Sequence, residues 1–217
     1  MISQAPDHVK RIAESTVRRL SLYLRFLEDF EKAGRLTISS GELAKSGGTT
    51  SAQVRKDLSF FGSFGKRGLG YSVRELIGAI RGILGLQHSW KVVIIGAGKI
   101  GAALAQYRGF RDRSFHVVGI FDNDAQRVGQ CYDGVTVAHA RALEADVRRL
   151  GAEMAIIAVP PDAAQEVADR VAAAGIHAIL DFSTAAITVP PSVTLRSMNM
   201  AVELEILSFA LTEGARS

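Results

Sequence analysis

Three glycines near the middle of the chain are spaced like a phosphate-binding turn. They lie in the run Gly96-Ala97-Gly98-Lys99-Ile100-Gly101, between an apolar strand at residues 91 to 95 and a helical run at residues 102 to 107. In this context Gly96 makes the tight turn, Gly98 lets the backbone approach a pyrophosphate, and Gly101 lets the helix pack against the strand. The free N–H groups at the helix start then face the phosphates. The run therefore predicts a dinucleotide-binding site.

An acidic residue stands where such a site receives the adenosine ribose. A second apolar strand, residues 116 to 121, ends in Asp122, 21 residues after Gly101. A carboxylate there can accept hydrogen bonds from both ribose hydroxyls and repels a 2′-phosphate at close range, so the pattern favours NAD(H) over NADP(H). Asn123 and Asp124 add no cation that would offset this repulsion. The alternative is that Asp122 only caps a turn with these two residues.

The rest of this half alternates strands with helices. We expect strands at residues 135 to 137, 154 to 159, 178 to 182 and 193 to 197, and helices at residues 141 to 150 and 163 to 174. This alternation predicts an α/β fold with an open, Rossmann-like parallel sheet. Val159 and Pro160 end one strand at the carboxyl edge, where ligands of such sheets bind, so we expect them beside the nucleotide. The Pro160-Pro161 pair also suits the start of the next helix, and both interpretations can hold.

No catalytic set accompanies the nucleotide site. The five histidines are scattered without a metal-spacing pair, and the one cysteine, Cys131, allows neither an intrachain disulfide nor a Cys-rich metal site. No Ser/His/acid arrangement stands out. We therefore expect neither an enzyme nor a metal-binding protein. No apolar run approaches the roughly 20 residues of a membrane span, and the first residues lack the apolar core of a signal peptide, so we expect a cytoplasmic protein without a membrane partner.

Positive charge is concentrated in the first part of the chain. Residues 1 to 86 carry 14 of the 26 Lys and Arg residues but 8 of the 22 Asp and Glu residues, so the remainder is slightly acidic. A basic domain joined to an acidic one suggests a polyanion partner, because Lys and Arg contacts to phosphates release condensed counterions. The alternative is a basic surface that only confers solubility.

The order of helices in the basic part is typical of a helix-turn-helix unit. Apolar residues at helical spacing predict one long helix at residues 8 to 32. Ser39-x-x-Glu42 is a capping box that opens a short second helix. Thr50-x-x-Gln53 is another, opening a third helix whose inward stripe consists of Val54, Leu58 and Phe61.

Four residues of the third helix lie opposite that stripe, at about 100° per residue. Arg can read guanine with two hydrogen bonds, and Lys or Ser can hold a phosphate, so this face predicts contacts in a DNA major groove. The alternative is an ordinary solvated helix face. The four residues are Ala52, Arg55, Lys56 and Ser59.

A basic hairpin is expected directly after the third helix. Residues 64 to 71 contain glycines that permit a tight hairpin, and Lys66 and Arg67 lie at its tip. Such a wing can enter the minor groove, where narrow A/T-rich DNA attracts Arg. A plain surface hairpin is the alternative. Helix and wing together predict a winged-helix DNA-binding domain.

The change in charge, a helix stop with a short linker near residue 87, and an apolar run near the end divide the chain into three parts. We expect a winged-helix domain at residues 1 to 86, a Rossmann-like domain at 87 to 199 and a terminal helix at 200 to 217. The terminal helix is apolar on nearly every side and is hard to solvate on one small domain, so we expect a partner subunit to bury it. Its apolar positions are Val202, Leu204, Ile206, Leu207, Phe209 and Leu211.

Six strings of residues match a known family pattern. They are residues 51 to 62, residues 65 to 71, the glycine run, Tyr107-Arg108-Gly109-Phe110, Phe121-Asp122-Asn123-Asp124 and Ala201-Val202-Glu203-Leu204. On these strings, which extend over nearly the whole chain, the protein resembles the bacterial redox-sensing transcriptional repressors called Rex. The resemblance implies a homodimer whose winged helices bind an inverted-repeat operator in double-stranded DNA. It also implies Rossmann domains that sense NADH against NAD+, terminal helices exchanged between subunits, and release of DNA by NADH.

Residue by residue, the resemblance assigns roles to both halves. It implies DNA contacts for Arg55, Lys56 and Ser59, and also for the wing residues Lys66 and Arg67. It further implies that the aromatic ring of Tyr107 lies near the nicotinamide.

The resemblance also implies a switch, and here the chain departs from the family pattern. Arg25 matches an arginine that pairs with an aspartate of the sensor domain in the DNA-binding form. The family has that Asp where this chain has Asn199, and Asn-Phe-Ala-Pro or similar where it has Asp181-Phe182-Ser183-Thr184. We hypothesise that Asp181 partly replaces the missing acid.

Two rival functions remain open at this point. One is a small NAD(P)-dependent reductase with a helical dimerisation extension. The other is a nucleotide-independent DNA-binding protein with a vestigial Rossmann domain.

Overall fold

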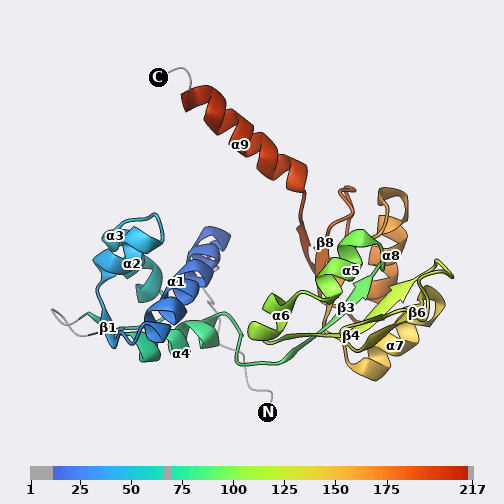
Figure 1. The fold of residues 1–217 in the computed structure, drawn as a ribbon, viewed down its shortest axis with the longest axis horizontal. Coiled ribbons are helices and arrows are strands. Elements are labelled where there is room, and N and C mark those ends of the chain that lie inside the picture. Colours follow the sequence, from blue (N-terminus) through green and yellow to red (C-terminus); the bar gives the residue numbers. More distant parts are fainter. Residues whose placement is uncertain (1–11, 66–69, 215–217) are drawn as a thin grey trace, which may run out of the picture. The chain divides into compact units, whose positions relative to one another are not determined.

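A computed structural model describes residues 12–65 and 70–214 and divides the chain into two units between His88 and Ser89 (Figure 1). The boundary expected from the sequence lies two residues earlier. The first unit contains helices and a two-stranded antiparallel sheet, and the second contains a seven-stranded sheet.

The first unit has the element order expected of a winged helix. Ser39 and Glu42 form the reciprocal capping box that starts α2, and the Ser72 hydroxyl accepts a hydrogen bond from the Glu75 N–H at the start of α4. The elements are α1 (Glu14–Lys32), β1 (Thr37–Ile38), α2 (Ser40–Ser46), α3 (Ser51–Ser59), β2 (Tyr71–Ser72) and α4 (Val73–Ile83).

The core of this unit lies where α1, α3 and α4 bring their apolar stripes together. Each fully buried leucine stabilises the fold by about 1.5–3 kcal/mol. Wholly or almost wholly buried side chains include Leu20, Leu24 and Leu27 of α1, Val54 and Leu58 of α3, and Leu76 and Ile80 of α4. This core fixes the inward side of α3 and therefore also fixes which of its residues face outward.

The small sheet brings two glycines together at the base of the expected wing. Ile38 of β1 lies opposite Tyr71 of β2. A Cβ added to Gly65 would lie 2.5 Å from the Gly70 carbonyl oxygen, and both residues have positive φ, at 81° and 79°. Only glycine fits this arrangement without strain. The predicted wing cations, Lys66 and Arg67, lie outside the described residues.

Some helix details differ from the sequence-based expectation. The first helix begins at Glu14, because Ala13 is extended with ψ 138°; residues 8 to 11 lie outside the described residues. The third helix ends at Ser59, so Phe61 is half-buried in the following turn and is not part of the inward stripe. Only one half of the second expected capping box forms, between the Gln53 N–H and the Thr50 hydroxyl.

The second unit is an α/β domain with a mostly parallel sheet. Its strand order is β5-β6-β4-β3-β7-β8-β9, and only the edge pair β5 and β6 is antiparallel. The elements up to the middle of the unit are β3 (Trp90–Ile95), α5 (Lys99–Ala105), α6 (Arg108–Asp112), β4 (Phe115–Asp122), β5 (Cys131–Tyr132), β6 (Val135–His139) and the 3-10 turn η1 (Ala140–Ala142). They are followed by α7 (Leu143–Leu150), β7 (Met154–Ile157), α8 (Pro161–Ala173), β8 (Ala178–Asp181), β9 (Thr194–Ser197) and α9 (Met200–Gly214).

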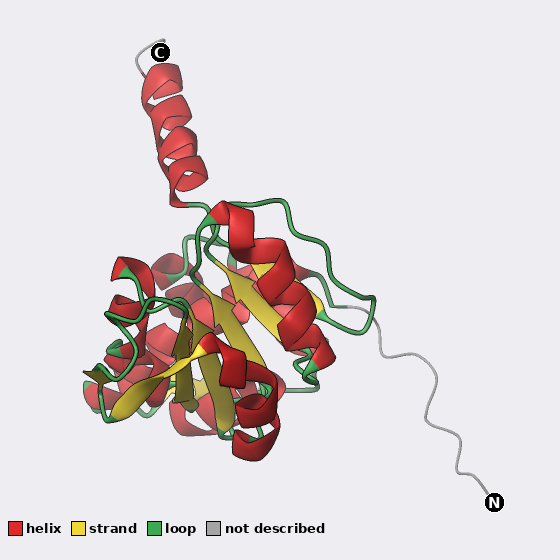
Figure 2. Cartoon of the chain, turned by 90° about the vertical axis from the view of Figure 1, so that its right-hand side faces the viewer, coloured by secondary structure: helices red, strands yellow, loops and turns green. Residues whose placement is uncertain are grey.

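Helices cover both faces of this sheet (Figure 2). Successive side chains of a strand point to opposite faces. Accordingly Val93 and Ile95 of β3 join the core formed with α7 and α8, whereas Val92 and Ile94 join the core that contains residues of α5 and α6. The central strand is thus buried on both sides, which explains its continuous apolar run.

The strand order reverses around β3, whose neighbours are β4 and β7. In open parallel sheets, ligands bind beside the carboxyl ends of the strands at such a switch point. The glycine turn follows β3, Asp122 ends β4, and Val159 and Pro160 follow β7. The fold therefore gathers the residues that the sequence indicated for the nucleotide at one edge.

Three short elements were not expected from the sequence, namely the two-residue strands β1 and β5 and the five-residue helix α6. Pro160 occupies the N-cap position of α8 and Pro161 its first turn, which confirms the interpretation that this pair starts a helix. Among the residues that the structure describes, no helix is both long and apolar enough to cross a membrane.

Candidate DNA-contact face and nucleotide site

The four predicted DNA-contact residues of α3 share its exposed side. Ala52, Arg55, Lys56 and Ser59 are all exposed, while Val54 and Leu58 are buried. Arg55 Nη1 donates a hydrogen bond to the Ser40 hydroxyl of α2 at 3.0 Å, and the Ser59 hydroxyl donates to the Lys56 carbonyl at 2.8 Å. The helix therefore presents two cations and a hydroxyl to one side, and α2 restrains one of the cations.

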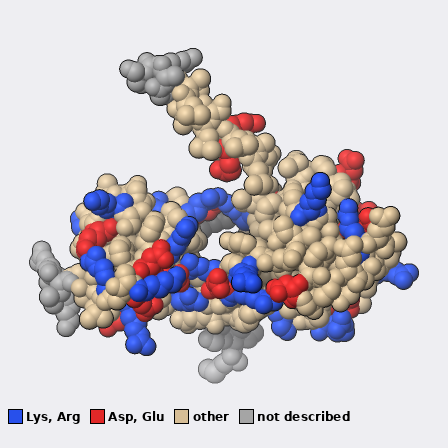
Figure 3. Space-filling model, in the orientation of Figure 1, with Lys and Arg blue, Asp and Glu red and all other residues tan. Residues whose placement is uncertain are grey.

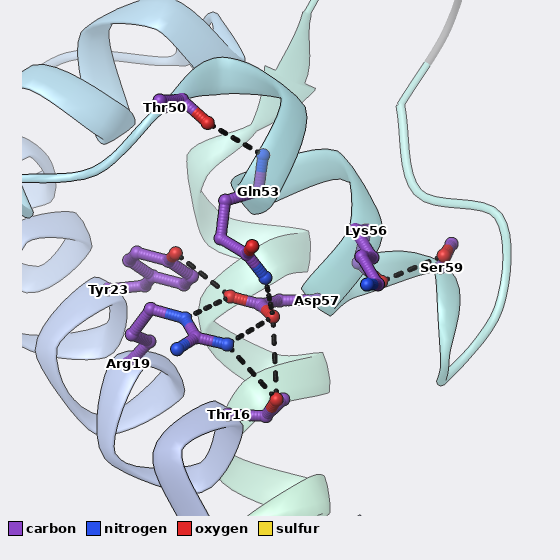
Figure 4. Close-up of polar contacts among 8 residues, drawn as sticks. All are labelled: Thr16, Arg19, Tyr23, Thr50, Gln53, Lys56, Asp57 and Ser59. Atoms are coloured by element: carbon purple, nitrogen blue, oxygen red, sulfur yellow. Dashed lines mark hydrogen bonds and ion pairs between the residues drawn. The ribbon is translucent and has the colours of Figure 1, made fainter. Parts of the chain in front are cut away.

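A buried acid holds the opposite side of α3 (Figure 4). Asp57 is 0% exposed, and its carboxylate accepts hydrogen bonds from Nε and Nη2 of Arg19 at 2.6 and 2.8 Å. The Tyr23 hydroxyl donates to Asp57 Oδ2 at 3.0 Å, and the Gln53 amide donates to Oδ1 at 2.8 Å. Figure 4 shows Asp57 pointing towards α1, with Lys56 and Ser59 on the other side of α3. This network fixes the rotation of α3 against α1, and so fixes the direction in which the exposed face points.

The same network shifts the titration of its members. Burial raises the pKa of Asp57, but hydrogen bonds from Arg19, Gln53 and Tyr23 outweigh it, so the pKa lies below its ordinary value. Burial, followed by the hydrogen bond to Asp57, raises the pKa of Tyr23 to about 12. Asp57 is therefore a carboxylate and Tyr23 a neutral phenol at neutral pH.

The sequence analysis gave no role to Asp57 or Arg19 and counted Tyr23 only among the apolar positions of the first helix, although a signal for this network was present. Asp57 falls beside Val54 and Leu58 on the inward side of its helix, and an acid on an apolar stripe requires a buried partner. Arg19 and Tyr23 are four residues apart on α1, so they lie on one face of that helix.

The glycine turn has the shape that its sequence predicted. Gly96 has φ 98°, and a Cβ there would collide with the Ala158 carbonyl group at the end of β7. A Cβ on Gly101 would collide with the Gly96 carbonyl, so this glycine lets α5 pack close to the turn. A Cβ on Gly98 would meet only Arg127 Nη1, at 3.7 Å. Space beside Gly98 is thus free of backbone and available to a ligand. Lys99 and Ile100 are exposed at the start of α5, and Ala97 is buried.

Asp122 ties this turn to the end of β4. Its Oδ2 accepts a hydrogen bond from the Ala97 N–H at 2.7 Å, and its Oδ1 accepts one from the Asp124 N–H at 2.8 Å. Asp122 therefore does cap the turn that follows β4, through the Asp124 N–H. Its bond to Ala97 additionally holds the glycine turn against the end of β4. Burial raises the pKa of Asp122, and the two backbone hydrogen bonds together with Arg127 lower it below its ordinary value.

Arg127 supplies the cation that Asn123 and Asp124 lack. Arg127 Nη1 lies 3.1 Å from Asp122 Oδ2, and Arg127 Nε lies 3.4 Å from Asp124 Oδ2. The sequence analysis considered only Asn123 and Asp124, which carry no cation, and it did not anticipate that Arg127 lies beside Asp122. Four residues, 123 to 126, lie between the end of β4 and Arg127, and no periodic sequence pattern predicts that the chain brings Arg127 back to Asp122.

A hollow of about 140 Å³ adjoins these residues. Its lining includes Gly96, Asp122 and Arg127, together with Val159 and Pro160. Tyr107 lines a different cavity of about 480 Å³, which shares no lining residue with this hollow. Within one chain, the structure therefore brings together the glycine turn, Asp122, Val159 and Pro160, but not Tyr107. Tyr107 is 59% exposed, and its ring stands edge-on to the ring of Phe110, with 5.1 Å between the ring centroids.

The three expected switch residues have different environments. Arg25 is exposed on α1, and Asn199 is exposed at the start of α9, where its Oδ1 accepts a hydrogen bond from the Ala201 N–H at 3.0 Å. Asp181 is 0% exposed. Its Oδ1 accepts from the Ser183 N–H at 2.8 Å, and its Oδ2 has no hydrogen-bond partner among the described residues. Within residues 12–65 and 70–214, no three His, Cys, Asp or Glu side chains gather as metal ligands would.

The last helix exposes its apolar side chains. Leu204, Phe209 and Leu211 of α9 are 67%, 68% and 77% exposed. The helix contains Glu203, Glu205 and Glu213 but no Lys or Arg, and Figure 3 shows it as a largely uncharged surface with acidic groups near its start. Among the residues that the structure describes, none buries these apolar side chains of α9.

Comparisons with known proteins agree with this division of the chain. The family described as "Putative DNA-binding protein N-terminus" matches residues 11–59, and the family described as "CoA binding domain" matches residues 87–185. The redox-sensing transcriptional repressor Rex of Carboxydothermus hydrogenoformans is 47% identical over 199 residues, which are 92% of this chain and 96% of that protein.

Two crystal structures of RSP, a Rex-family repressor, match over nearly the whole chain. The complex of RSP with β-NADH is 35% identical, has a TM-score of 0.87 and covers 95% of this chain and 97% of its own. The complex with β-NAD+ and operator DNA is 37% identical, has a TM-score of 0.89 and covers 94% of each chain.

Proposed function

Since this chain belongs to the Rex family of redox-sensing transcriptional repressors, we propose that it represses transcription by binding operator DNA and that NADH releases it. The observation that carries this proposal is the presence, in one chain, of a cationic outward face on α3 and a glycine turn tied to Asp122. The first suits a polyanion and the second a dinucleotide.

Arg55, Lys56 and Ser59 are the residues of α3 that would contact DNA. Arg55 is placed to read a base edge, while Lys56 and Ser59 can hold the phosphate backbone. Ala52, on the same exposed side, leaves room for close approach. Lys66 and Arg67 would form the tip of a wing that enters the minor groove of the DNA.

The nucleotide would bind across the switch point of the second unit. Gly96 to Gly101 would surround the pyrophosphate, Asp122 would accept from the adenosine ribose, and Val159 and Pro160 would border the nicotinamide side. RSP was crystallised with β-NADH and with β-NAD+, and the same two nucleotides are proposed here. Tyr107 lies outside this hollow in one chain, so a role beside the nicotinamide requires it to act from a second subunit or after a rearrangement.

The exposed apolar helix α9 supports a homodimer. Its apolar residues lie on all sides, so burial of the whole helix requires that it insert into a partner rather than lie on a surface. Exchange of α9 between two copies satisfies this requirement symmetrically. A two-fold dimer places two α3 helices on DNA as symmetry mates, which calls for an inverted-repeat operator.

A DNA-binding assay with controlled nucleotide tests the proposal. Genomic fragments selected by the full chain supply a labelled duplex, and anisotropy gives its dissociation constant alone, with saturating NAD+ and with saturating NADH. We expect tight binding alone and with NAD+, and at least about tenfold weaker binding with NADH. Binding that NADH leaves unchanged would indicate a nucleotide-independent DNA-binding protein. Absence of any selected fragment, together with turnover of NADH with a carbonyl substrate, would indicate the reductase.

A further inference from the structure

Arg127 lies between the two parts of the nucleotide site that have separate roles. Its Nη1 is 3.1 Å from Asp122 Oδ2 and 3.7 Å from the position that a Cβ would take at Gly98. Gly98 is where the fingerprint lets a pyrophosphate approach the backbone, and Asp122 is where it receives the ribose. The guanidinium therefore borders both the phosphate and the ribose positions.

Hydrogen-bonding capacity remains on this guanidinium. Arginine has five N–H donors, and the contacts of Arg127 to protein use Nη1 towards Asp122 and Nε towards Asp124. Its side chain is 43% exposed, so the remaining donors can meet a ligand in the hollow. A planar guanidinium can hold a carboxylate with one edge and a phosphate with another.

The charge balance of the hollow also requires a cation. Asp122 and Glu166 line the hollow and Asp124 lies against Arg127, so negative charge is already present where a diphosphate would add more. Of the two cations that line the hollow, Arg170 is already committed, with Nε and Nη2 donating to Glu144 at 2.6 and 3.1 Å and Nη2 also donating to the Ala140 carbonyl at 2.7 Å. Arg127 is thus the lining cation that is placed to offset a diphosphate beside Gly98.

We propose that Arg127 is a nucleotide-binding residue that contacts the diphosphate of the ADP half while it stays paired with Asp122. This inference rests on the proposed function, because it assigns a residue to the nucleotide site described there. The diphosphate is common to NADH and NAD+. Arg127 therefore contributes to the affinity of both forms equally and does not discriminate between them.

Competition titrations on the full chain test this role. Bound NADH is followed by fluorescence and is displaced with NAD+, ADP, adenosine, or ADP carrying a 2′-phosphate. We expect Arg127→Gln to weaken NADH, NAD+ and ADP by the same factor, about tenfold to hundredfold, as for the loss of a charge-assisted hydrogen bond. Adenosine should be nearly unaffected because it lacks the diphosphate. Arg127→Lys should retain part of the affinity, since it keeps the charge but not the planar fork.

Arg149→Gln is the matched control. Arg149 also forms an ion pair with an acid three residues away, Asp146 at 2.8 Å, but it lies on α7 and does not line the hollow. Arg149→Gln should leave the affinity for every nucleotide probe unchanged. Circular dichroism of each variant verifies that the fold is retained.

Three outcomes would overturn the assignment. Unchanged or increased ADP affinity in Arg127→Gln would mean that Arg127 only caps Asp122 or competes with the ligand. An equal loss for adenosine and ADP would mean that it acts on the ribose through Asp122. A loss confined to the 2′-phosphorylated probe would place it at the 2′ position. Nucleotide binding without any NADH effect on DNA would instead refute the proposed function and leave this assignment standing.

Discussion

Substituting Asn for Asp57 removes a buried charge from the back of the helix that would contact DNA. The carboxylate accepts from Arg19, Tyr23 and Gln53, all within 3.0 Å. The amide of Asn keeps only one acceptor oxygen. Its NH2 group would take the place of the other carboxylate oxygen and would face side chains that donate hydrogen bonds there. Breaking a buried ion pair costs about 3–5 kcal/mol. Because the Arg19 side chain is 25% exposed and can partly reach water, we expect a loss of about 3 kcal/mol in the unfolding free energy of the first unit.

Two spectroscopic probes separate the units in a urea titration of the full chain. The only tryptophan, Trp90, lies at the start of β3 and reports on the second unit, whereas far-UV circular dichroism follows the helices of both. We expect Asp57→Asn to shift the circular dichroism transition of the first unit to lower urea and to leave the Trp90 transition in place. Operator affinity should also fall, although Asp57 faces away from the exposed side of α3. Asp29→Asn is the matched control, because Asp29 pairs with Lys32 at 3.7 Å and its side chain is 62% exposed.

The pH dependence gives a second test of the same network. The folded pKa of Asp57 is below its ordinary value of 3.8, so its stabilisation is present above that pH and is lost as pH falls through the folded pKa. Tyr23 behaves oppositely, because its pKa rises from 10.0 to about 12, so its contribution is complete below pH 10.0 and is lost between pH 10.0 and 12. If Asp57→Asn and Asp29→Asn shift the urea transition by the same amount and lose stability over the same acidic pH range, the Asp57 network does not stabilise the first unit.

Four further results are expected. Arg55→Ala should weaken operator binding by about 1–3 kcal/mol, and Lys66→Ala or Arg67→Ala should weaken it less and lower the salt slope by about 1; unchanged affinity in all three would refute the winged-helix assignment. The unmodified chain should prefer NADH to NADPH in fluorescence titrations, and Asp122→Ala combined with a nearby introduced Arg should reverse that preference; equal affinities in the unmodified chain would mean that Asp122 does not face the ribose. Phe209→Glu in α9 should shift sedimentation from dimer towards monomer, since a charge would be buried in the interface, and a dimer of undiminished affinity would place the interface elsewhere. Asn199→Asp should increase the NADH-dependent loss of operator affinity and Asp181→Asn should reduce it; if Asp181→Asn responds like the unmodified chain, Asp181 does not replace the missing acid.

Features that depend on neighbouring residues were predictable from the sequence. The capping box at Ser39 and the turn at Gly96 each need only a few residues in order, and the structure contains both. The central strands followed from uninterrupted apolar runs, because a parallel sheet buries its strands on both faces. The end of α3 was not predictable in the same way, since Phe61 continues the apolar spacing after the helix has stopped.

Contacts between distant residues were not predictable from local patterns. Arg19 and Asp57 are 38 residues apart, and only the packing of α1 against α3 brings them together. Arg127 returns to Asp122 through a loop, where spacing carries no periodic signal. Asp181 could be placed at a strand end from the sequence, but its complete burial could not, because burial depends on which distant elements pack around that strand end.

The two residues that depart from the family pattern, Asp181 and Asn199, have different local environments. Asn199 caps the start of α9 through its Oδ1, and Asn and Asp serve equally well as caps, so the choice between them depends on what the side chain meets beyond its own helix. Asp181 is internal, and to pair with Arg25 its carboxylate would have to leave Ser183 and reach the surface. A backbone link offers a shorter route, because the Met198 N–H donates to the Asp181 carbonyl at 2.7 Å, directly before Asn199. Any influence of Asp181 on the switch therefore passes more readily through the position of this segment than through a direct ion pair.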